Sequence, residues 1–163
     1  MLVWGVDDIG EAVRYLRTFV WHLCPVTDPK VSVHLDGVRL PVRNLKDYAG
    51  IVSPDGSVIY DEGTDMQVAV CPARDGLASA IGFVNGIPCH AGTHVNYALN
   101  RVRDIVSAAL GKNKDCSANV LRGHLTLLVN IKAINPTFTS QTKEQMSLDM
   151  RKSGCSWDPS PAF

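Results

Sequence analysis

The sequence predicts an α+β fold, a mixed or antiparallel sheet with helices packed on one face. Two long segments, residues 9–24 and 94–110, carry apolar residues at helical spacing. Between and after them lie short segments that alternate apolar and polar residues, or are largely apolar, with Asp-Gly and Asn-Gly turns between them. The order helix, hairpin, short helix, strands, long helix and strand is typical of the α+β class.

The first helix has a defined start and end. Asp8-Ile-Gly-Glu11 matches the capping-box pattern, with a carboxylate in place of the commoner hydroxyl. Pro25 ends the helix, because proline cannot continue its hydrogen bonding. One apolar stripe follows the cap and is made up of Ile9, Ala12, Val13, Leu16, Phe19, Val20 and Leu23. The pattern predicts an amphipathic helix.

A β-hairpin is predicted next. Residues 31–35 and 38–42 flank Asp36-Gly37, a dipeptide typical of two-residue hairpin turns. Pro41 limits the second strand, since proline in sheets is confined to edges and strand ends. Further along, the pattern predicts a short helix at 44–50 that ends at a glycine, and strands at 57–60, 66–71 and 77–84.

The second half of the chain begins with the second long helix. We expect a Thr93 cap at its start and Gly111 at its end. Residues 125–133 begin with an apolar run, which is typical of a buried central strand. Residues 154–163 are expected to be irregular and mobile.

Composition narrows the function classes. At 163 residues, with 45% apolar and 20% charged residues, the chain resembles one globular domain. Sixteen basic residues balance sixteen acidic ones, so net charge gives no sign of bulk affinity for nucleic acid. No apolar run reaches the ~18 residues of a membrane span, and the N-terminus lacks the basic flank of a secretory signal. Five cysteines without a Cys-x-x-Cys pair favour reduced thiols inside a cell.

The most informative segment is the polar loop at residues 135–144, which follows the predicted central strand. Its Lys143 offers a compact positive charge, and Gln141 and Thr142 offer neutral hydrogen-bonding groups. Such a set can bind a phosphate and stabilise the charge that develops on it during hydrolysis. The alternative is a solvated loop lysine, because short Gln-Thr-Lys strings are common.

Two other groups of residues could carry chemistry. Cys89, His90 and His94 lie within six positions, and thiolate and imidazole are zinc ligands, but no fourth ligand is evident. The same residues could form a cysteine–histidine nucleophile pair, although no orienting acid accompanies them. Lys112 and Lys114 follow the second long helix, where they could contact a DNA backbone or balance the helix dipole.

Five segments, in order, resemble the transducer domain of type IIA DNA topoisomerases of the eukaryotic and large-virus kind. Residues 135–146 are similar to that family's E-N-P-T-F-D-S-Q-T-K-E-N-M, and residues 92–97 to its G-G-x-H-V-D-Y. Residues 82–87 resemble S-F-V-N-x-I, residues 31–42 resemble the family hairpin, and residues 112–114 fall where the family has a lysine-rich loop.

The resemblance implies a phosphate-sensing role. Lys143 would be the catalytic contact to the terminal phosphate of ATP, and Gln141 and Thr142 would help to hold that phosphate. A preceding GHKL ATPase domain would bind most of the ATP and its magnesium, and Lys112 and Lys114 would be candidate DNA contacts. Loss of the phosphate would release the loop and rotate the two domains, which couples hydrolysis to DNA strand passage.

The resemblance also implies an organisation. Residues 1–24 would be a helix linking to the absent ATPase domain, residues 25–153 the transducer domain, and residues 154–163 a C-terminal tail or linker. The partners would be DNA, the ATPase and cleavage domains of the parent enzyme, and a second parent copy in a homodimer, without a membrane. The parent would act inside the cell, in the nucleus or in a viral or host cytoplasm.

Several features of the parent enzyme are missing from the sequence. It shows no GHKL motif and no acidic cluster of a cleavage domain, so the isolated chain is expected to be an inactive fragment with no metal site of its own. Ala91 and Thr139 depart from the family pattern outside the Gln-Thr-Lys core. Two alternatives stay open: a stand-alone nucleic-acid-binding module of the same fold, and a Cys/His metal-binding protein.

Overall fold

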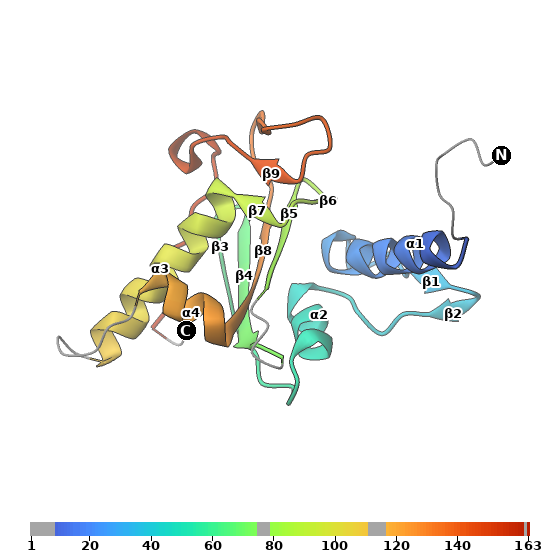
Figure 1. The fold of residues 1–163 in the computed structure, drawn as a ribbon, viewed down its shortest axis with the longest axis horizontal. Helices are drawn as coiled ribbons and strands as arrows, with labels where there is room; N and C mark the ends of the chain where they lie inside the picture. The colour runs from blue at the N-terminus through green and yellow to red at the C-terminus, as the bar shows by residue number, and fades with distance from the viewer. Residues whose placement is uncertain (1–8, 75–78, 111–116, 162) are drawn as a thin grey trace.

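The computed structural model describes residues 9–74, 79–110, 117–161 and 163. Its centre is a five-stranded sheet with the order β3-β4-β8-β5-β6 (Figure 1). The strand bounds are Ile59–Gly63 for β3, Met66–Pro72 for β4, Ala80–Val84 for β5, Ile87–Pro88 for β6 and Leu125–Ile131 for β8. The predicted Asp8 cap, the first two residues of the strand predicted at 77–84, the Gly111 cap and both Lys112 and Lys114 fall outside the described residues.

The central strand β8 makes the sheet mixed. It pairs antiparallel with β4, where Val68 lies opposite Val129, and parallel with β5, where Gly82 lies opposite Val129. A parallel pair requires a crossover, and the helices α3 (Thr93–Leu110) and α4 (Ala118–His124) lie within that crossover. The α+β class and the buried central strand are therefore confirmed.

Helices cover both faces of the sheet, so the prediction of helices on one face is wrong. On one face, Val95 and Leu99 of α3 pack in a cluster with Val129 of β8. On the other, α2 (Leu45–Val52) packs with the neighbouring strand residue Leu128 (Figure 1). The reason lies in β4 and β8, whose successive residues are buried, as expected for strands covered on both sides.

The first helix, α1 (Ile9–Leu23), has the predicted length but buries none of its residues. Its apolar stripe faces solvent: Ile9 is 67% exposed and Leu16 61%. In Figure 1 the helix lies on the side of the sheet that α2 covers, beyond α2 itself. An amphipathic helix gains most of its stability by packing its apolar face, and here most of the stripe from Ile9 to Phe19 is left uncovered, whereas Val20 packs against the cluster under α2.

The predicted hairpin forms, with shorter strands than expected: β1 (His34–Leu35) and β2 (Val38–Arg39). Asp36 and Gly37 both have positive φ, 51° and 78°, as a two-residue turn of type I′ requires. The rest of the second segment leaves the hairpin, because Leu40 and Val42 are buried in the cluster under α2.

The short helix α2 begins as predicted but runs two residues beyond Gly50. The Asn44 side chain accepts a hydrogen bond from the Asp47 backbone N–H at 2.8 Å, which caps the helix. Cys24 and Pro25, in the 3-10 turn η1 (Cys24–Val26) that ends α1, are buried. In the described parts of the chain, no helix has the length and hydropathy of a membrane span.

The C-terminal segment, residues 154–163, is irregular as predicted, but it is packed against the domain and is not a loose tail. Trp157 is fully buried, and its Nε1 donates to Asp61 of β3 at 3.1 Å. The Ser160 backbone N–H donates to the same carboxylate at 2.8 Å. The Tyr97 hydroxyl of α3 donates to the Trp157 carbonyl at 3.0 Å. Because this large ring is buried between a strand and a helix, it holds the described residues around it against the domain.

Candidate functional site

The Gln-Thr-Lys loop, residues 135–144, starts just after the central strand β8, as predicted. Three hydrogen bonds fix the strand end that leads into it. The Lys132 N–H donates to the Asp65 carbonyl at 2.9 Å, and the Asn85 side chain donates to the Ala133 carbonyl at 2.9 Å. The Ile134 N–H donates to the Ser153 carbonyl at 2.8 Å. The loop therefore leaves the sheet from a rigid base.

The returning arm of the loop is held by a second small sheet. Strand β9 (Gln145–Met146) pairs in parallel with β7 (Ala91–Gly92), and both lie at the same end of the molecule as the loop (Figure 1). Gly92 has a φ of 118°, and a Cβ there would overlap the Met146 backbone. Only glycine allows the two strands to approach this closely.

Gly92→Ala should detach β9, because the added methyl overlaps backbone atoms and the φ is strained for alanine. We expect a loss of about 2 kcal/mol or more in the free energy of unfolding, measured by urea denaturation. Gly123→Ala, at a helical glycine with open space around it, is the matched control and should change stability little. An equal effect of the two substitutions would contradict this account.

The two arms of the loop pair with each other up to its tip. Thr139 N–H donates to the Gln145 carbonyl at 3.0 Å, and Ser147 N–H donates to the Thr137 carbonyl at 2.8 Å. These bonds make the loop a narrow hairpin-like projection. Its tip, where Gln141 and Thr142 are exposed, is thus presented to solvent.

The tip is a tight turn that contains the three predicted phosphate ligands. Lys143 N–H donates to the Ser140 carbonyl at 3.2 Å, so Gln141 and Thr142 are the central residues of the turn. The hydroxyls of Ser140 and Thr142 are 2.7 Å apart and share a hydrogen bond. Lys143 has a φ of 59°, a left-handed conformation that a non-glycine residue keeps only where its surroundings impose it.

The Lys143 side chain has no carboxylate partner among the described residues. Its Nζ lies 5.9 Å from the centroid of the Phe138 ring, within the range of a cation–π contact. Gln141 and Thr142 are exposed. The structure thus brings the three predicted residues together, with a cation available to an outside anion.

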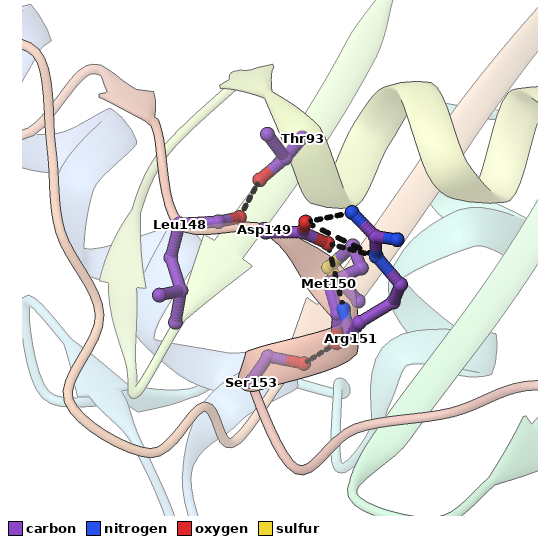
Figure 2. A network of polar contacts seen from close by, with 6 residues as sticks. All are labelled: Thr93, Leu148, Asp149, Met150, Arg151 and Ser153. Atoms are coloured by element: carbon purple, nitrogen blue, oxygen red, sulfur yellow. Dashed lines mark hydrogen bonds and ion pairs between the residues drawn. The ribbon is translucent and has the colours of Figure 1, made fainter.

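The chain that follows the loop passes the start of α3 (Figure 2). Thr93 is the first residue of α3 and not its cap as predicted, and its hydroxyl donates to the Leu148 carbonyl at 2.5 Å. Asp149 caps the 3-10 turn η2 (Met150–Lys152) and pairs with Arg151 at 2.6 Å. Hydrogen bonds from Arg151 lower the pKa of Asp149 to about 2, which keeps the carboxylate charged.

The Cys89, His90 and His94 side chains do not converge on one point. Cys89 Sγ donates to the Ala91 carbonyl at 3.5 Å, and burial raises the pKa of this thiol. His94 Nε2 is 2.9 Å from the Cys89 carbonyl oxygen. Within residues 9–74, 79–110, 117–161 and 163, no group of three potential metal ligands comes together. The thiol is therefore protonated and inert, and neither the zinc site nor the nucleophile pair finds support.

His94 predicts a dependence of stability on pH. The ring is fully buried, its Nδ1 has no hydrogen-bond partner, and burial lowers its pKa to about 4. The unfolded chain takes up the proton near 6.5, so stability is full above that pH and is lost as the pH falls toward 4. The loss should reach roughly 3 kcal/mol in urea unfolding.

A His34→Gln control should leave this pH dependence in place, because His34 is exposed. A His94→Gln variant should show a shallower fall in stability between the same pH values. If the free energy of unfolding fell with pH equally in the His94→Gln variant and the wild type, His94 would be ruled out as the source of the pH dependence.

Sequence reasoning missed the features that depend on contacts between distant residues. These include the β7–β9 pair, the helix α4, and the Trp157–Asp61 hydrogen bond. A tryptophan in an otherwise polar tail was the only sequence signal for the last of them. The four described cysteines, Cys24, Cys71, Cys89 and Cys155, are buried and free, as the prediction of reduced thiols requires.

Comparison with known proteins identifies the family. A family model described as DNA gyrase B matches residues 39–156. DNA topoisomerase 2 of Drosophila melanogaster is 33% identical over 164 residues, which cover 91% of this chain and 11% of that protein. DNA topoisomerase 2 of Penicillium chrysogenum is 31% identical over an alignment of 171 positions. The alignment covers 92% of this chain and 10% of that protein.

Solved structures agree with the sequence comparisons. The ATPase region of Saccharomyces cerevisiae topoisomerase II matches 94% of this chain and 40% of its own, with a TM-score of 0.75 and 28% identity. The ATPase and transducer domains of DNA topoisomerase II from Balamuthia mandrillaris share the fold, with a TM-score of 0.80, 24% identity and the same coverage. The chain thus spans about a tenth of its curated relatives. It belongs to the DNA gyrase B family and has the fold of the transducer part of the topoisomerase II region that it matches.

Proposed function

We propose that this chain is the transducer portion of an ATP-hydrolysing type IIA DNA topoisomerase, and that its Gln-Thr-Lys loop senses the terminal phosphate of ATP. The observation that carries the proposal is the loop itself. Lys143 lies at the tip of a projection anchored on both arms, without a carboxylate partner among the described residues. A preplaced cation of this kind stabilises negative charge without reorganisation during the reaction.

The three tip residues have distinct roles in this proposal. Lys143 supplies the charge, and Gln141 and Thr142 supply neutral hydrogen bonds to the same phosphate. ATP with magnesium is held mainly by a GHKL ATPase domain outside this chain. Moving Lys143 from the Phe138 ring to a phosphate exchanges a weak cation–π contact for a direct charge pair.

The ATPase domain is the partner that we assign to the exposed stripe of α1. Residues 1–24 form the link to that domain, residues 25–153 the transducer, and residues 154–163 the C-terminal linker. The apolar side chains that the partner would cover are Ile9, Val13, Leu16 and Phe19. Their helical spacing fits a partner that buries one face of the helix.

In this proposal, the two arms of the loop transmit the effect of phosphate binding to the rest of the domain. A nucleotide that contacts Lys143 in only one arrangement of the two domains favours that arrangement. The chain runs from the loop through residues 147–153 into the packed C-terminal segment, so the loop and the chain exit are joined by hydrogen-bonded backbone. We infer that this path carries the motion toward the cleavage domain of a homodimeric parent inside the cell, which passes one DNA duplex through another.

A chimera tests the function directly. The region of yeast topoisomerase II that matches this chain is replaced by residues 9–163, and decatenation of linked DNA circles is measured with and without ATP. We expect ATP-dependent decatenation, reduced by Lys143→Ala. A folded chimera, checked by circular dichroism, that hydrolyses ATP equally well with and without Lys143 would overturn the sensing role.

DNA contact by Lys112 and Lys114 stays a prediction, because both residues lie outside the described parts of the chain. Replacing both with alanine should weaken DNA binding about equally for all sequences, since phosphate contacts carry no base information. The slope of log affinity against log salt should fall by about 2. An unchanged salt slope would exclude these contacts. A second outcome would favour a stand-alone nucleic-acid-binding module. In that case DNA affinity would depend on Lys112 and Lys114, and Lys143→Ala would leave ATP turnover unchanged.

A further inference from the structure

Two histidines from distant parts of the chain meet where α1 joins the rest of the domain. The rings of His22, in the last turn of α1, and His90, between β6 and β7, have centroids 5.4 Å apart. His22 also makes edge contacts with Tyr48 of α2 at 6.1 Å and with Phe83 of β5 at 5.9 Å. These ring contacts join α1 to the sheet together with Val20 and Trp21, which pack against the cluster under α2, whereas most residues of the earlier turns are exposed.

The hydrogen bonding of His90 requires a neutral ring. Its Nδ1 accepts a hydrogen bond from the Gly82 backbone N–H at 3.2 Å, and a protonated imidazole cannot accept there. Gly82 lacks a Cβ, which would overlap the Cys89 carbonyl beside this bond. The next residue, Ala91, lies in β7 and donates its N–H to Glu144 at the end of the Gln-Thr-Lys loop. His90 is thus next to the strand that holds the loop.

No acidic group offsets a positive charge at this junction. The titratable groups beside the pair are Tyr48 of α2, Cys24 of η1, Cys89, and His94 of α3. Within the described residues, no carboxylate forms an ion pair or hydrogen bond with either imidazole. A proton taken up here would therefore be buried beside aromatic rings and a second imidazole without a counter-charge.

We propose that the His22–His90 pair is a proton-sensitive latch that holds α1 against the sheet and releases it when the pair is protonated. Protonation of His90 removes the acceptor for the Gly82 N–H, and a charge on either ring repels a charge on the other. The released helix carries the apolar stripe to which we assign the ATPase domain. The latch thus adds pH control between that domain and the loop, and in this respect it rests on the proposed function.

The direction of the effect follows from the two imidazoles. Burial lowers the pKa of both, and the neighbouring His90 lowers that of His22 further. A released α1 takes up protons near the ordinary pKa of 6.5, so docking is complete above that pH and weakens as the pH falls below it.

Hydrogen exchange of the 9–163 chain tests the latch at the helix itself. Between pH about 7.5 and about 5.5, the protection factors of the last-turn amides of α1 should fall about tenfold, and the fall that His94 causes in α3 over the same range should persist in the variants below. In the His22→Gln/His90→Gln double variant the fall should shrink to less than about twofold, and each single variant should show a smaller fall than the wild type, since glutamine cannot be protonated and at position 90 can still accept the Gly82 hydrogen bond. His34→Gln, at an exposed histidine, should behave as the wild type.

Three results would overturn the latch: protection of α1 that does not change with pH, a full fall retained in the double glutamine variant, and α1 amides without protection at pH about 7.5. None of these involves ATP. If the exchange test fails but Lys143→Ala lowers ATP turnover, the latch is wrong and the proposed function holds. If the exchange test succeeds and Lys143→Ala has no effect, the latch holds and the sensing role is wrong.

Discussion

Replacing Lys143 with alanine should lower ATP turnover by the enzyme that carries this chain about 10²-fold, the size expected for loss of one preplaced group that stabilises transition-state charge. The fall should appear mainly in kcat, because most contacts to the nucleotide belong to the ATPase domain. The measurement is steady-state ATP hydrolysis, together with strand passage at saturating ATP. Both should decline together if hydrolysis and domain motion are coupled through the loop.

Control substitutions separate the charge from the fold. Lys46→Ala removes an exposed lysine from α2, on the sheet face opposite α3, and should leave turnover unchanged. Lys143→Arg keeps the charge in a planar group and should recover part of the activity. Equal turnover in the Lys143→Ala and Lys46→Ala enzymes would show that the tip lysine does not contact the nucleotide.

Replacing Trp157 with alanine should cost about 3–5 kcal/mol in the free energy of unfolding, the range for removing a fully buried large aromatic ring. The ring is completely buried in the cluster under α3, and its loss also leaves Asp61 with one fewer donor. Because a single domain is stable by only about 5–15 kcal/mol, this would remove a large share of the total. Urea denaturation monitored by circular dichroism gives the value.

A phenylalanine at the same position distinguishes packing from hydrogen bonding. Trp157→Phe keeps most of the apolar contact and loses the Nε1 hydrogen bond, so it should cost less than the alanine change, on the order of 1–2 kcal/mol. Val31→Ala, at an exposed position, is the control and should cost little. A Trp157→Ala chain as stable as the wild type would mean that residues 154–163 do not contribute to the fold.

The sequence predicted where the candidate site lies in the fold, but it did not predict the strands that hold the loop in place. Residues 135–144 were expected at the end of an inner strand, since the largely apolar start of residues 125–133 is typical of a strand buried on both faces. The arms of the loop were not predictable, because β7 and β9 have two residues each and so carry no periodic signal.

Other features were not predicted because they depend on contacts between residues far apart in the sequence. The tail looked mobile because it is rich in polar residues and proline, and only its contacts with Asp61 and Tyr97 show that it is fixed. The pairing of His22 with His90 depends on how α1 meets the sheet, which no local pattern encodes. Lys143 was named from its chemistry, whereas its left-handed backbone follows from the turn at Ser140.

The place of β8 in the sheet has a consequence for biosynthesis. This strand inserts between β4 and β5, which both precede it in the chain. Until Leu125–Ile131 has left the ribosome, both neighbours present open edges, and exposed edges of apolar strands invite pairing with other chains. Non-local pairing of this kind also forms slowly. A polypeptide truncated before Leu125 is therefore an aggregation hazard, and the loop can acquire its shape only after the sheet has closed.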